Sequence, residues 1–452
     1  MMTDILEGTP GTAGGIPRDK VPEPELSNRP ITGDRYWSLE FASREWDRLW
    51  SRVWQVAGRV AELTAAGDYI TYEIGRESIL CVRGSDERIR AFYNVCQHRG
   101  NRLVSATAGS LAGGEFQCAY HGWRYADEGT LVWAHDEDDF PDGNPCGRRN
   151  LIQLPCETWA GFVWFNQDPE AAPLREWLDP VTDHLDRYRM EDMRRTHWVT
   201  VEGDFNWKCV QDNFNESYHL PFVHPQTMAS MNEHHTGCQF DLYPSGHCRM
   251  LMPGGGPGPQ YQGPPDKTFA SLAQDFEFWE FDPEPYRNNL SGLRVALQRQ
   301  KRELGSTKGY DFSSYSDEQL TDHYHYTVFP NISFSMKPDG CIWLRSAPHP
   351  TDPEKCIFDM WYLTLFPESV SEYYSNSMHD WVSIDHPVEQ QLGAVGEVSC
   401  GPGIDQDLAI WTSQHAGLRS QGYRGEYLSW QERRIRYFHD NIDRHLALAP
   451  LS

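Results

Sequence analysis

The chain has 452 residues, of which 39% are hydrophobic, and a formal net charge of −25. This length exceeds what one core usually serves, so we expect two domains. The acidic balance argues against nucleic acid as a partner, because phosphate binding requires a basic surface. Neither a membrane-spanning apolar run nor a signal peptide is present, and the 11 cysteines are too scattered for a disulfide scaffold. We therefore expect a cytoplasmic protein that binds no membrane.

The first part of the chain predicts an arm followed by a small all-β domain. Residues 1–30 are rich in Gly, Pro and Thr without a period, and we assign residues 1–36 to a loosely held N-terminal arm. Residues 38–54 place apolar groups at helical spacing. Short segments rich in β-branched and aromatic residues, separated by turn residues, then predict strands at 68–74, 78–82 and 88–93. We assign residues 37–175 to this domain, including the preceding helix.

Two short motifs within this domain have the composition of metal-binding loops. Cys96 and His98 stand in Cys-Gln-His, and Cys118 and His121 stand in Cys-Ala-Tyr-His. Two thiolates and two imidazoles suit a transition metal, and this set matches a Rieske [2Fe–2S] cluster, in which two histidines replace two cysteines on one iron. The alternative is a structural Cys₂His₂ zinc site, which usually groups Cys with Cys and His with His. The mixed order favours the cluster.

An acidic run at residues 136–139 follows these motifs. We interpret it as a solvated loop. The alternative is a docking site for a basic electron donor.

The remainder, residues 176–452, predicts a second domain of sheet and helices after a polar, helical connection over 170–195. Sequential strands with few crossover helices favour an antiparallel sheet, and we expect these strands at 197–202, 324–329, 332–336, 341–345 and 356–366. The spacing of apolar residues near the C-terminus predicts an amphipathic helix carrying Leu428, Ile435, Phe438, Ile442 and Leu446. The fold class is therefore α+β.

One segment interrupts this pattern. Residues 253–265 are dominated by Gly and Pro, which exclude a helix or a central strand. We expect a poorly ordered region from there to about residue 318. It is either a lid or a plain surface insertion.

A second metal site is indicated at the start of this domain. If residues 207–219 are helical, Asp212, Glu216 and His219 share one face. Pro221 cannot continue that helix, so His224 lies on the next turn and can fold back towards His219. Two histidines beside acids suit the iron of non-haem oxygenases, which use two histidines and one carboxylate.

The two motif pairs together resemble the large (α) subunit of Rieske non-haem iron oxygenases, in the aromatic-ring-hydroxylating dioxygenase family. The resemblance rests on Cys96-Gln-His98-Arg-Gly and Cys118-Ala-Tyr-His121-Gly-Trp, with His219 and His224 about 100 residues later. It extends from about residue 36 to the C-terminus. It implies a catalytic domain of the helix-grip type, with mononuclear Fe(II) on the two later histidines.

The resemblance also implies a third iron ligand, an aspartate late in the chain. Asp407 fits this position best, because it precedes a Gly-Leu pair as the family's ligand does. Asp405 is the alternative. Either residue could instead cap a helix that starts near residue 408.

Glu216 occupies the position of a family carboxylate that links an iron histidine to a cluster histidine of the neighbouring subunit. Many aromatic-ring dioxygenases have aspartate there, and glutamate resembles the branch with quaternary-amine monooxygenases. Asp212 and Asn213 are expected to support the same helix face, although Asp212 could be a helix-surface acid. We group these three residues as candidates for roles in catalysis.

These features predict the terminal oxygenase of a multicomponent system. The resemblance implies that it uses O₂ and electrons from NAD(P)H, which arrive through a separate reductase, with or without a ferredoxin. The expected reaction is the hydroxylation or dihydroxylation of an aromatic or largely apolar substrate, as in aromatic hydrocarbon catabolism. One alternative is a monooxygenase acting on a quaternary amine, and another is an electron-transfer protein without oxygenase activity. The resemblance implies a homotrimer or a multiple of one, and leaves a small β subunit open.

Overall fold

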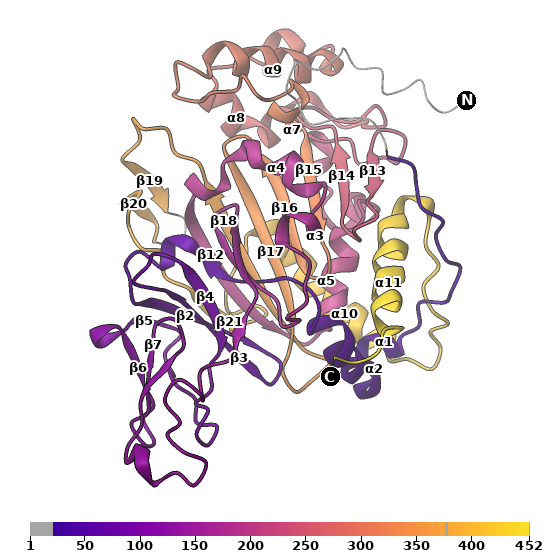
Figure 1. Ribbon diagram of the computed structural model, residues 1–452. Helices are drawn as coiled ribbons and strands as arrows, with labels where there is room; N and C mark the ends of the chain where they lie inside the picture. The colour runs from indigo at the N-terminus through magenta and orange to yellow at the C-terminus, as the bar shows by residue number, and fades with distance from the viewer. Residues whose placement is uncertain (1–20, 376–377, 452) are drawn as a thin grey trace. The chain divides into compact units, whose positions relative to one another are not determined.

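The computed structural model describes residues 21–375 and 378–451 (Figure 1). It forms two compact units. The smaller contains Ser43–Trp177 with residues 445–451, and the larger contains residues 21–42 and Leu178–Arg444. No helix in these ranges is both long enough and apolar enough to cross a membrane.

The smaller unit consists mainly of β-sheets, as expected for this domain, and their paired strands are antiparallel. Its five-stranded sheet has the order β5-β2-β3-β4-β9, and β1-β11-β10 and β6-β7-β8 form three-stranded sheets. In β2, Ile70, Tyr72 and Ile74 are buried while Glu73 is exposed, which is the alternation that a half-buried strand requires. The elements are β1 Gln55–Arg59, β2 Asp68–Ile74, β3 Glu77–Arg83, β4 Ile89–Tyr93, β5 Ala108–Ser110, β6 Glu115–Gln117, β7 Arg124–Ala126, β8 Leu131–Trp133, β9 Gln153–Leu154, β10 Cys156–Trp159, β11 Phe162–Phe165 and helix α3 Leu174–Trp177.

The larger unit is built on an eight-stranded sheet of order β13-β14-β15-β16-β17-β18-β12-β21. Adjacent strands are antiparallel except β12 and β21, which are parallel, so the expectation of an antiparallel sheet is wrong for this pair. Between β18 and β21 the chain forms the β19–β20 hairpin. Strand β21 then runs beside β12 in the same direction as β12. The strands are β12 Arg194–Gly203, β13 Gln239–Leu242, β14 Cys248–Met252, β15 His323–Val328, β16 Ile332–Lys337, β17 Gly340–Pro348, β18 Cys356–Thr364, β19 Glu372–Ser375, β20 Asp380–Ser383 and β21 Gln391–Ala394.

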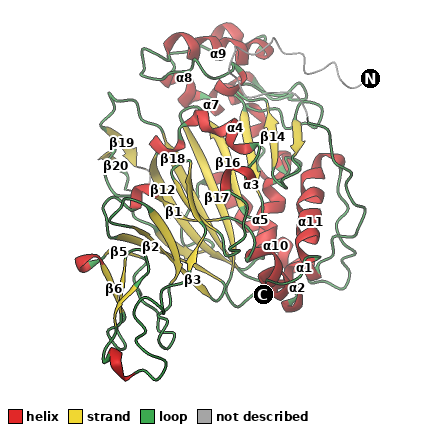
Figure 2. Cartoon of the chain, viewed as in Figure 1, coloured by secondary structure: helices red, strands yellow, loops and turns green. Residues whose placement is uncertain are grey.

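Helices α5 (Trp207–Phe214), α10 (Pro402–Leu418) and α11 (Arg433–Leu446) gather on one face of this sheet (Figure 2). The Trp411 ring of α10 is buried between Phe214 of α5 and Phe358 of β18, with ring centroids 5.8 and 5.4 Å away. This contact fixes α10 against both α5 and the sheet. The amphipathic C-terminal helix is confirmed as α11, although Leu428 precedes it.

The remaining helices are short, apart from one. They are α1 Asp34–Trp37, α2 Leu39–Glu45, α4 Val181–Leu185, α6 Leu220–Val223, α7 Pro265–Ser271, α8 Ala273–Phe278 and the longer α9 Leu293–Leu304. The helix expected over 38–54 is shorter than that, because α2 passes into a π-helical turn that ends at Trp50.

Two expectations of loose structure are wrong for the described residues. The region to residue 318 contains α7, α8 and α9, which Figure 1 shows grouped at one end of the sheet. The Gly and Pro density ends at Pro265, which starts α7 because its ring suits a first helical turn. In the expected arm, the Ser27 backbone N–H donates to Asp440 over 2.9 Å. Residues 1–20 of that arm lie outside the described residues.

Candidate metal centres

Two loops of the smaller unit repeat one local design around the predicted cluster ligands. Cys96 N–H donates to Asn101 O and Gly100 N–H to Cys96 O, while Cys118 N–H donates to Trp123 O and Gly122 N–H to Cys118 O. The two glycines have φ of 75° and 72°, a left-handed conformation that glycine adopts without strain. Each loop therefore starts with a buried cysteine and closes through a glycine.

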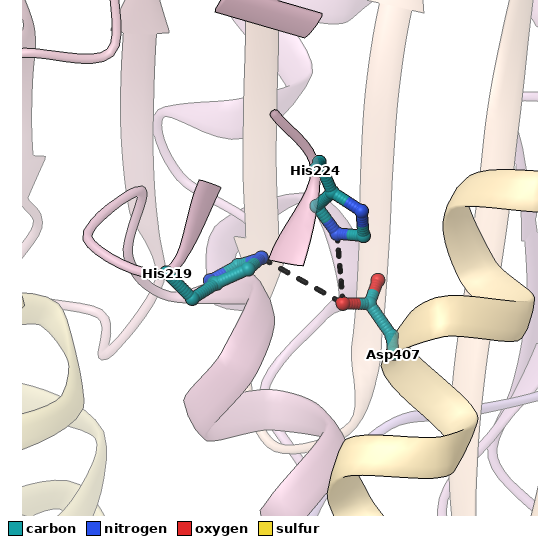
Figure 3. Close-up of side chains that lie close together, drawn as sticks. All are labelled: His219, His224 and Asp407. Atoms are coloured by element: carbon teal, nitrogen blue, oxygen red, sulfur yellow. Dashed lines mark hydrogen bonds and ion pairs between the residues drawn. The ribbon is translucent and has the colours of Figure 1, made fainter. Parts of the chain in front are cut away.

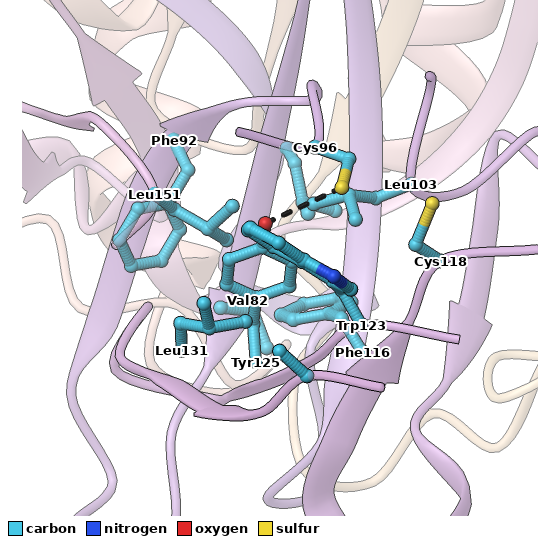
Figure 4. Packing of buried hydrophobic residues seen from close by; sticks show 12 residues of the cluster. Val82, Phe92, Cys96, Leu103, Phe116, Cys118, Trp123, Tyr125, Leu131 and Leu151 are labelled. Carbon is cyan, nitrogen blue, oxygen red and sulfur yellow. Dashed lines mark hydrogen bonds between the residues drawn. The ribbon is translucent and has the colours of Figure 1, made fainter. Parts of the chain in front are cut away.

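The cysteines and histidines of these loops converge. Figure 4 shows Cys96 and Cys118 at the margin of a buried cluster, and the cluster comprises Leu80, Val82, Phe92, Cys96, Leu103, Phe116, Cys118, Trp123, Tyr125, Leu131, Ala134 and Leu151. The His98 and His121 rings lie 4.6 Å apart, and His98 stacks on Trp123 at an interplanar angle of 9°. His98 Nδ1 is buried without a hydrogen-bond partner among the described residues. A buried imidazole nitrogen without a hydrogen-bond partner, on a ring that stacks on a member of the cysteine-containing cluster, fits the ligation of a Rieske cluster.

Two further side chains approach the cysteine sulfurs and were not predicted from the sequence. The Tyr125 hydroxyl lies 3.3 Å from Cys96 Sγ and accepts a hydrogen bond from Gln97 N–H. The Asn101 amide nitrogen lies 3.7 Å from Cys118 Sγ. Hydrogen bonds to cluster sulfurs tune the reduction potential. Trp123 and Tyr125 are two positions apart and both are buried, as expected for one face of a strand. This spacing was the only sequence pattern that could have indicated that Tyr125 lies on the same side as Trp123.

The helix predicted over 207–219 is wrong, because α5 ends at Phe214. Asn215 N–H bonds back to Gln211 O and Asp212 O and so terminates the helix. Glu216 therefore lies beyond the helix, as does His219. Pro221 does not continue α5, as expected, and lies instead in the first turn of the separate helix α6, where its missing N–H has no partner to lose.

His219, His224 and Asp407 converge despite this difference (Figure 3). His224 Nε2 lies 2.9 Å from Asp407 Oδ1, and His219 Nε2 lies 3.7 Å from the same oxygen. The two imidazole rings are 5.2 Å apart at an interplanar angle of 76°. His224 and Asp407 are buried. Two imidazoles and one carboxylate around a common point are the donor set of non-haem Fe(II) sites, so these residues fit a mononuclear iron.

Each histidine of this set is held through Nδ1, the ring nitrogen that points away from Asp407. Glu216 Oε1 lies 2.5 Å from His219 Nδ1, and Gln406 Oε1 lies 2.8 Å from His224 Nδ1. Such contacts orient the rings and leave Nε2 for a metal. Gln406 was not predicted from the sequence. Its position next to Asp407 is the only sequence feature that could have indicated its role.

The two candidate aspartates have different surroundings. Asp405 accepts hydrogen bonds from Cys400 N–H over 2.8 Å and from the Ser399 hydroxyl over 2.6 Å. Asp405 therefore holds the segment that precedes α10 against the first turn of that helix, whose N-cap is Gly401 and which begins at Pro402 and not near residue 408. Asp407 is the aspartate that faces the two histidines.

Asp212 and Asn213 do not join the histidines. Asp212 is buried, so the reading of a helix-surface acid is wrong, and it bonds to Tyr36 and His439. Burial raises the pKa of Asp212 to about 7. The Asn213 amide nitrogen is buried without a hydrogen-bond partner among the described residues.

Comparison with known proteins identifies two matched regions. Residues 190–448 match the catalytic domain of the ring-hydroxylating alpha subunit, and residues 53–142 match the Rieske [2Fe–2S] domain. Relatives include the glycine betaine monooxygenase oxygenase subunit of Pseudomonas aeruginosa, 31% identical over 39% of this chain and 41% of the relative. The carnitine monooxygenase oxygenase subunit of Escherichia coli K12 is 35% identical over 36% of this chain and 44% of the relative. The matches thus span about half or less of these relatives.

Solved structures share the fold over most of the chain. A quaternary ammonium Rieske monooxygenase in complex with L-carnitine has a TM-score of 0.65 at 19% identity, covering 94% of this chain and 99% of the other. Naphthalene 1,2-dioxygenase with indole has a TM-score of 0.66 at 20% identity, covering 94% of each chain. The predicted α+β fold and family are confirmed: the chain belongs to the ring-hydroxylating oxygenase alpha subunits, with a Rieske [2Fe–2S] domain preceding the catalytic domain.

Proposed function

We propose that this protein is the terminal oxygenase component of a multicomponent Rieske oxygenase. In this proposal residues 37–175 hold a [2Fe–2S] cluster on Cys96, His98, Cys118 and His121, and residues 176–452 hold Fe(II). The observation that carries the proposal is the convergence of His219, His224 and Asp407. Three protein ligands leave coordination positions open, which a purely structural site would fill.

When bound, the two metal groups would supply electron storage and oxygen activation. The residues of the chain hold and orient them. Glu216 and Gln406 fix the two imidazoles through Nδ1, and burial of Asp407 excludes water from the carboxylate. The co-substrate is O₂, and the electrons come from NAD(P)H through a separate reductase, with or without a ferredoxin. An electron-transfer protein without oxygenase activity is the weaker candidate for the function, because it would not need the second metal site.

We further propose a homotrimer or a multiple of one, with or without a small β subunit. In such an assembly the cluster of one subunit serves the iron of its neighbour. Glu216 is the residue of this chain that would join the two centres, because its carboxylate already holds the His219 segment through His219 Nδ1 and His219 N–H.

An aromatic or largely apolar substrate, hydroxylated or dihydroxylated, is the first candidate, supported by the relative that is a 2-aminobenzenesulfonate 2,3-dioxygenase alpha subunit in Alcaligenes sp.. A quaternary amine is the second. Two observations favour it: glutamate stands at position 216, and relatives are oxygenase subunits of glycine betaine and carnitine monooxygenases.

The test is turnover under ¹⁸O₂ with a reconstituted reductase, using both substrate classes and following the labelled product. The purified protein should carry about two irons and two sulfides in the cluster, plus one further iron. The variant Cys96→Ala should lose the visible spectrum of the cluster. A colourless protein that binds zinc and still folds would refute the proposal.

A further inference from the structure

One buried histidine on the sheet of the larger unit has a ring nitrogen without a partner. His325 of β15 is 4% exposed, and its Nε2 has no hydrogen-bond partner among the described residues. Its ring stacks on Phe214 of α5, with the centroids 6.0 Å apart and an interplanar angle of 17°. The side chain therefore lies on the sheet face that α5 and α10 cover. Because buried polar groups are nearly always paired, this nitrogen points to a ligand.

Arg434 decides which nitrogen of His325 carries the hydrogen. The Nη2 atom of Arg434 lies 3.2 Å from His325 Nδ1. A guanidinium group only donates, so Nδ1 accepts and the neutral ring carries its hydrogen on Nε2. Burial lowers the pKa of His325 well below its ordinary value of 6.5 and so keeps the ring neutral. His325 thus presents a buried N–H donor on the side of the ring turned away from Arg434.

The charge of Arg434 is buried without a carboxylate partner. The guanidinium is fully buried, and its other acceptors are Cys248 Sγ, Phe214 O and the Thr327 hydroxyl. The Cys248 thiol donates in turn to Asn215 Oδ1, so it is neutral. Among the described residues, Arg434 forms no ion pair. A buried cation that has only neutral acceptors favours an anion nearby.

The sheet face at His325 is less completely covered than the face next to it. His325, Ser335, Ile342 and Tyr362 lie directly opposite one another on β15, β16, β17 and β18, and so form a row on one face. The last three members of this row are half-buried. The neighbouring row on the same face is buried throughout and consists of Thr327, Ser333, Leu344 and Met360. The row of His325 therefore begins the part of this face on which side chains stay accessible.

The segment that carries His219 reaches one end of the row. Leu220, which directly follows His219, packs against the cluster of Cys238, Phe240, Met250 and Met252. Met250 lies on β14 directly opposite His325. Packed side chains thus connect His325 to the segment of one proposed iron ligand.

Helix α10, which carries Asp407, reaches the same row. A Cβ built on Gly401, directly before α10, would lie 3.9 Å from the Tyr362 hydroxyl at the far end of the row. Trp411 lies one turn after Asp407 and contacts Phe214, the ring on which His325 stacks. The two segments that supply the proposed iron ligands therefore flank the row.

We propose that the row of His325, Ser335, Ile342 and Tyr362 is the floor of the substrate site, and that His325 Nε2–H donates a hydrogen bond to an acidic oxygen of the substrate, a carboxylate or a sulfonate. Ile342 and Tyr362 present mainly apolar surface to the remainder of the substrate, as in most small-molecule sites. The inference rests on the proposed function and narrows its substrate class to organic acids, including zwitterions.

Matched pairs of probes test this donor. 2-Aminobenzenesulfonate is compared with aniline, and glycine betaine with tetramethylammonium, because each pair differs in the acidic group. Equilibrium binding and turnover are measured for the wild type and His325→Phe, which keeps a flat ring beside Phe214 and removes the donor. We expect the Kd of the acidic probe that binds to rise roughly 10- to 100-fold, the effect of losing a hydrogen bond to a charged group. The Kd of its non-acidic partner should stay unchanged.

Three further variants separate the donor from the floor and from general disturbance. His325→Gln keeps an N–H donor and should restore most of the binding. Ile342→Trp fills the floor and should weaken both members of a pair. His184→Phe is the matched control and should bind as the wild type does. His184 is also buried with an unpartnered ring nitrogen, but it packs on Tyr326, which points to the other face of β15.

Unchanged binding of the acidic probe in His325→Phe would overturn the inference, as would an equal loss for its non-acidic partner or failure of both acids to bind the wild type. Unchanged binding in Ile342→Trp would show that the row is not the floor. Thermal unfolding checks that each variant folds, and His325→Leu replaces His325→Phe if the latter does not. If acids bind through His325 but no probe is oxidised, the binding site stands and the proposed function fails. Oxidation of a probe with equal Kd in the wild type and His325→Phe gives the reverse result.

Discussion

The phenol oxygen of Tyr36 lies 2.6 Å from Asp212 Oδ2 and so joins α1 to α5 within the larger unit. The same oxygen lies 2.7 Å from Glu426 Oε1 and 3.2 Å from His439 Nε2. Burial lowers the pKa of His439 to about 3, so its ring is neutral. The phenol has one proton for two carboxyl groups, and the neutral His439 ring is the second possible donor, at 3.2 Å from Asp212 Oδ1.

This arrangement makes stability depend on pH. Burial raises the pKa of Asp212 and of Glu426 to about 7, from ordinary values of 3.8 and 4.5. The folded state then binds more protons than the unfolded state, so stability falls as pH rises from about 4 through 7. Neighbouring charged or titratable groups are Arg35, Lys208, Cys209, Glu216, Tyr423, Glu432 and Asp443.

We expect the Tm to decrease from pH 5 to pH 8 and Glu426→Gln to flatten that decrease, because glutamine mimics the protonated acid. Thermal unfolding at closely spaced pH values provides the measurement. Glu303→Gln is the control, since Glu303 is exposed. If Glu426→Gln keeps the pH slope of the wild type, Glu426 is not the group whose titration sets that slope.

The reduction potential of the cluster should depend on Tyr125. Tyr125→Phe removes the hydroxyl 3.3 Å from Cys96 Sγ and keeps the ring in the core. A hydrogen bond that strengthens by about 1 kcal/mol on reduction corresponds to roughly 40 mV for one electron. We therefore expect a potential lower by roughly that amount with the cluster retained, measured by redox titration. Tyr374→Phe serves as control because Tyr374 is exposed and belongs to the larger unit, and an equal shift in both variants would contradict the prediction.

The two aspartates of α10 should differ in their effect on iron. Asp407→Ala and His219→Ala should lose the mononuclear iron and the oxygenase activity while keeping the visible spectrum of the cluster, because the two centres use different residues. Asp405→Ala should retain iron and lose about 1 kcal/mol of stability, because its hydrogen bonds from Ser399 and Cys400 are removed. Metal analysis and unfolding curves measure both effects. Loss of iron in Asp405→Ala but not in Asp407→Ala would show that Asp405, and not Asp407, is the iron ligand.

Glu216→Gln should separate metal content from electron transfer. The substitution keeps the size and removes the charge beside His219 Nδ1, so both centres should stay occupied. Product formation in a single turnover should slow by roughly 10–100-fold, the usual effect of losing a residue that supports a metal ligand. The measurement follows cluster oxidation and product together in pre-reduced protein. Wild-type rates for both would show that Glu216 does not link the centres.

The sequence by itself determined the features that depend on neighbours along the chain. Cys96 and Cys118 begin loops closed by hydrogen bonds within five residues, so the motif and its geometry are one local unit. The hairpin between β16 and β17 is likewise set by its turn residues, with Lys337 paired to Gly340. Alternation and helical spacing indicated the main strands and α11, because these patterns follow directly from burial of one face.

Tertiary structure decided which residues meet across long separations. Asp405 and Asp407 are two positions apart, so they point about 200° apart around one helix, and the packing of Trp411 on Phe214 and Phe358 selects the face that meets His224. The same applies to Tyr36 with Asp212, since no local pattern relates residues 176 positions apart. Such contacts depend on how helices pack on the sheet, and the free energy of that packing is distributed over side chains throughout the core.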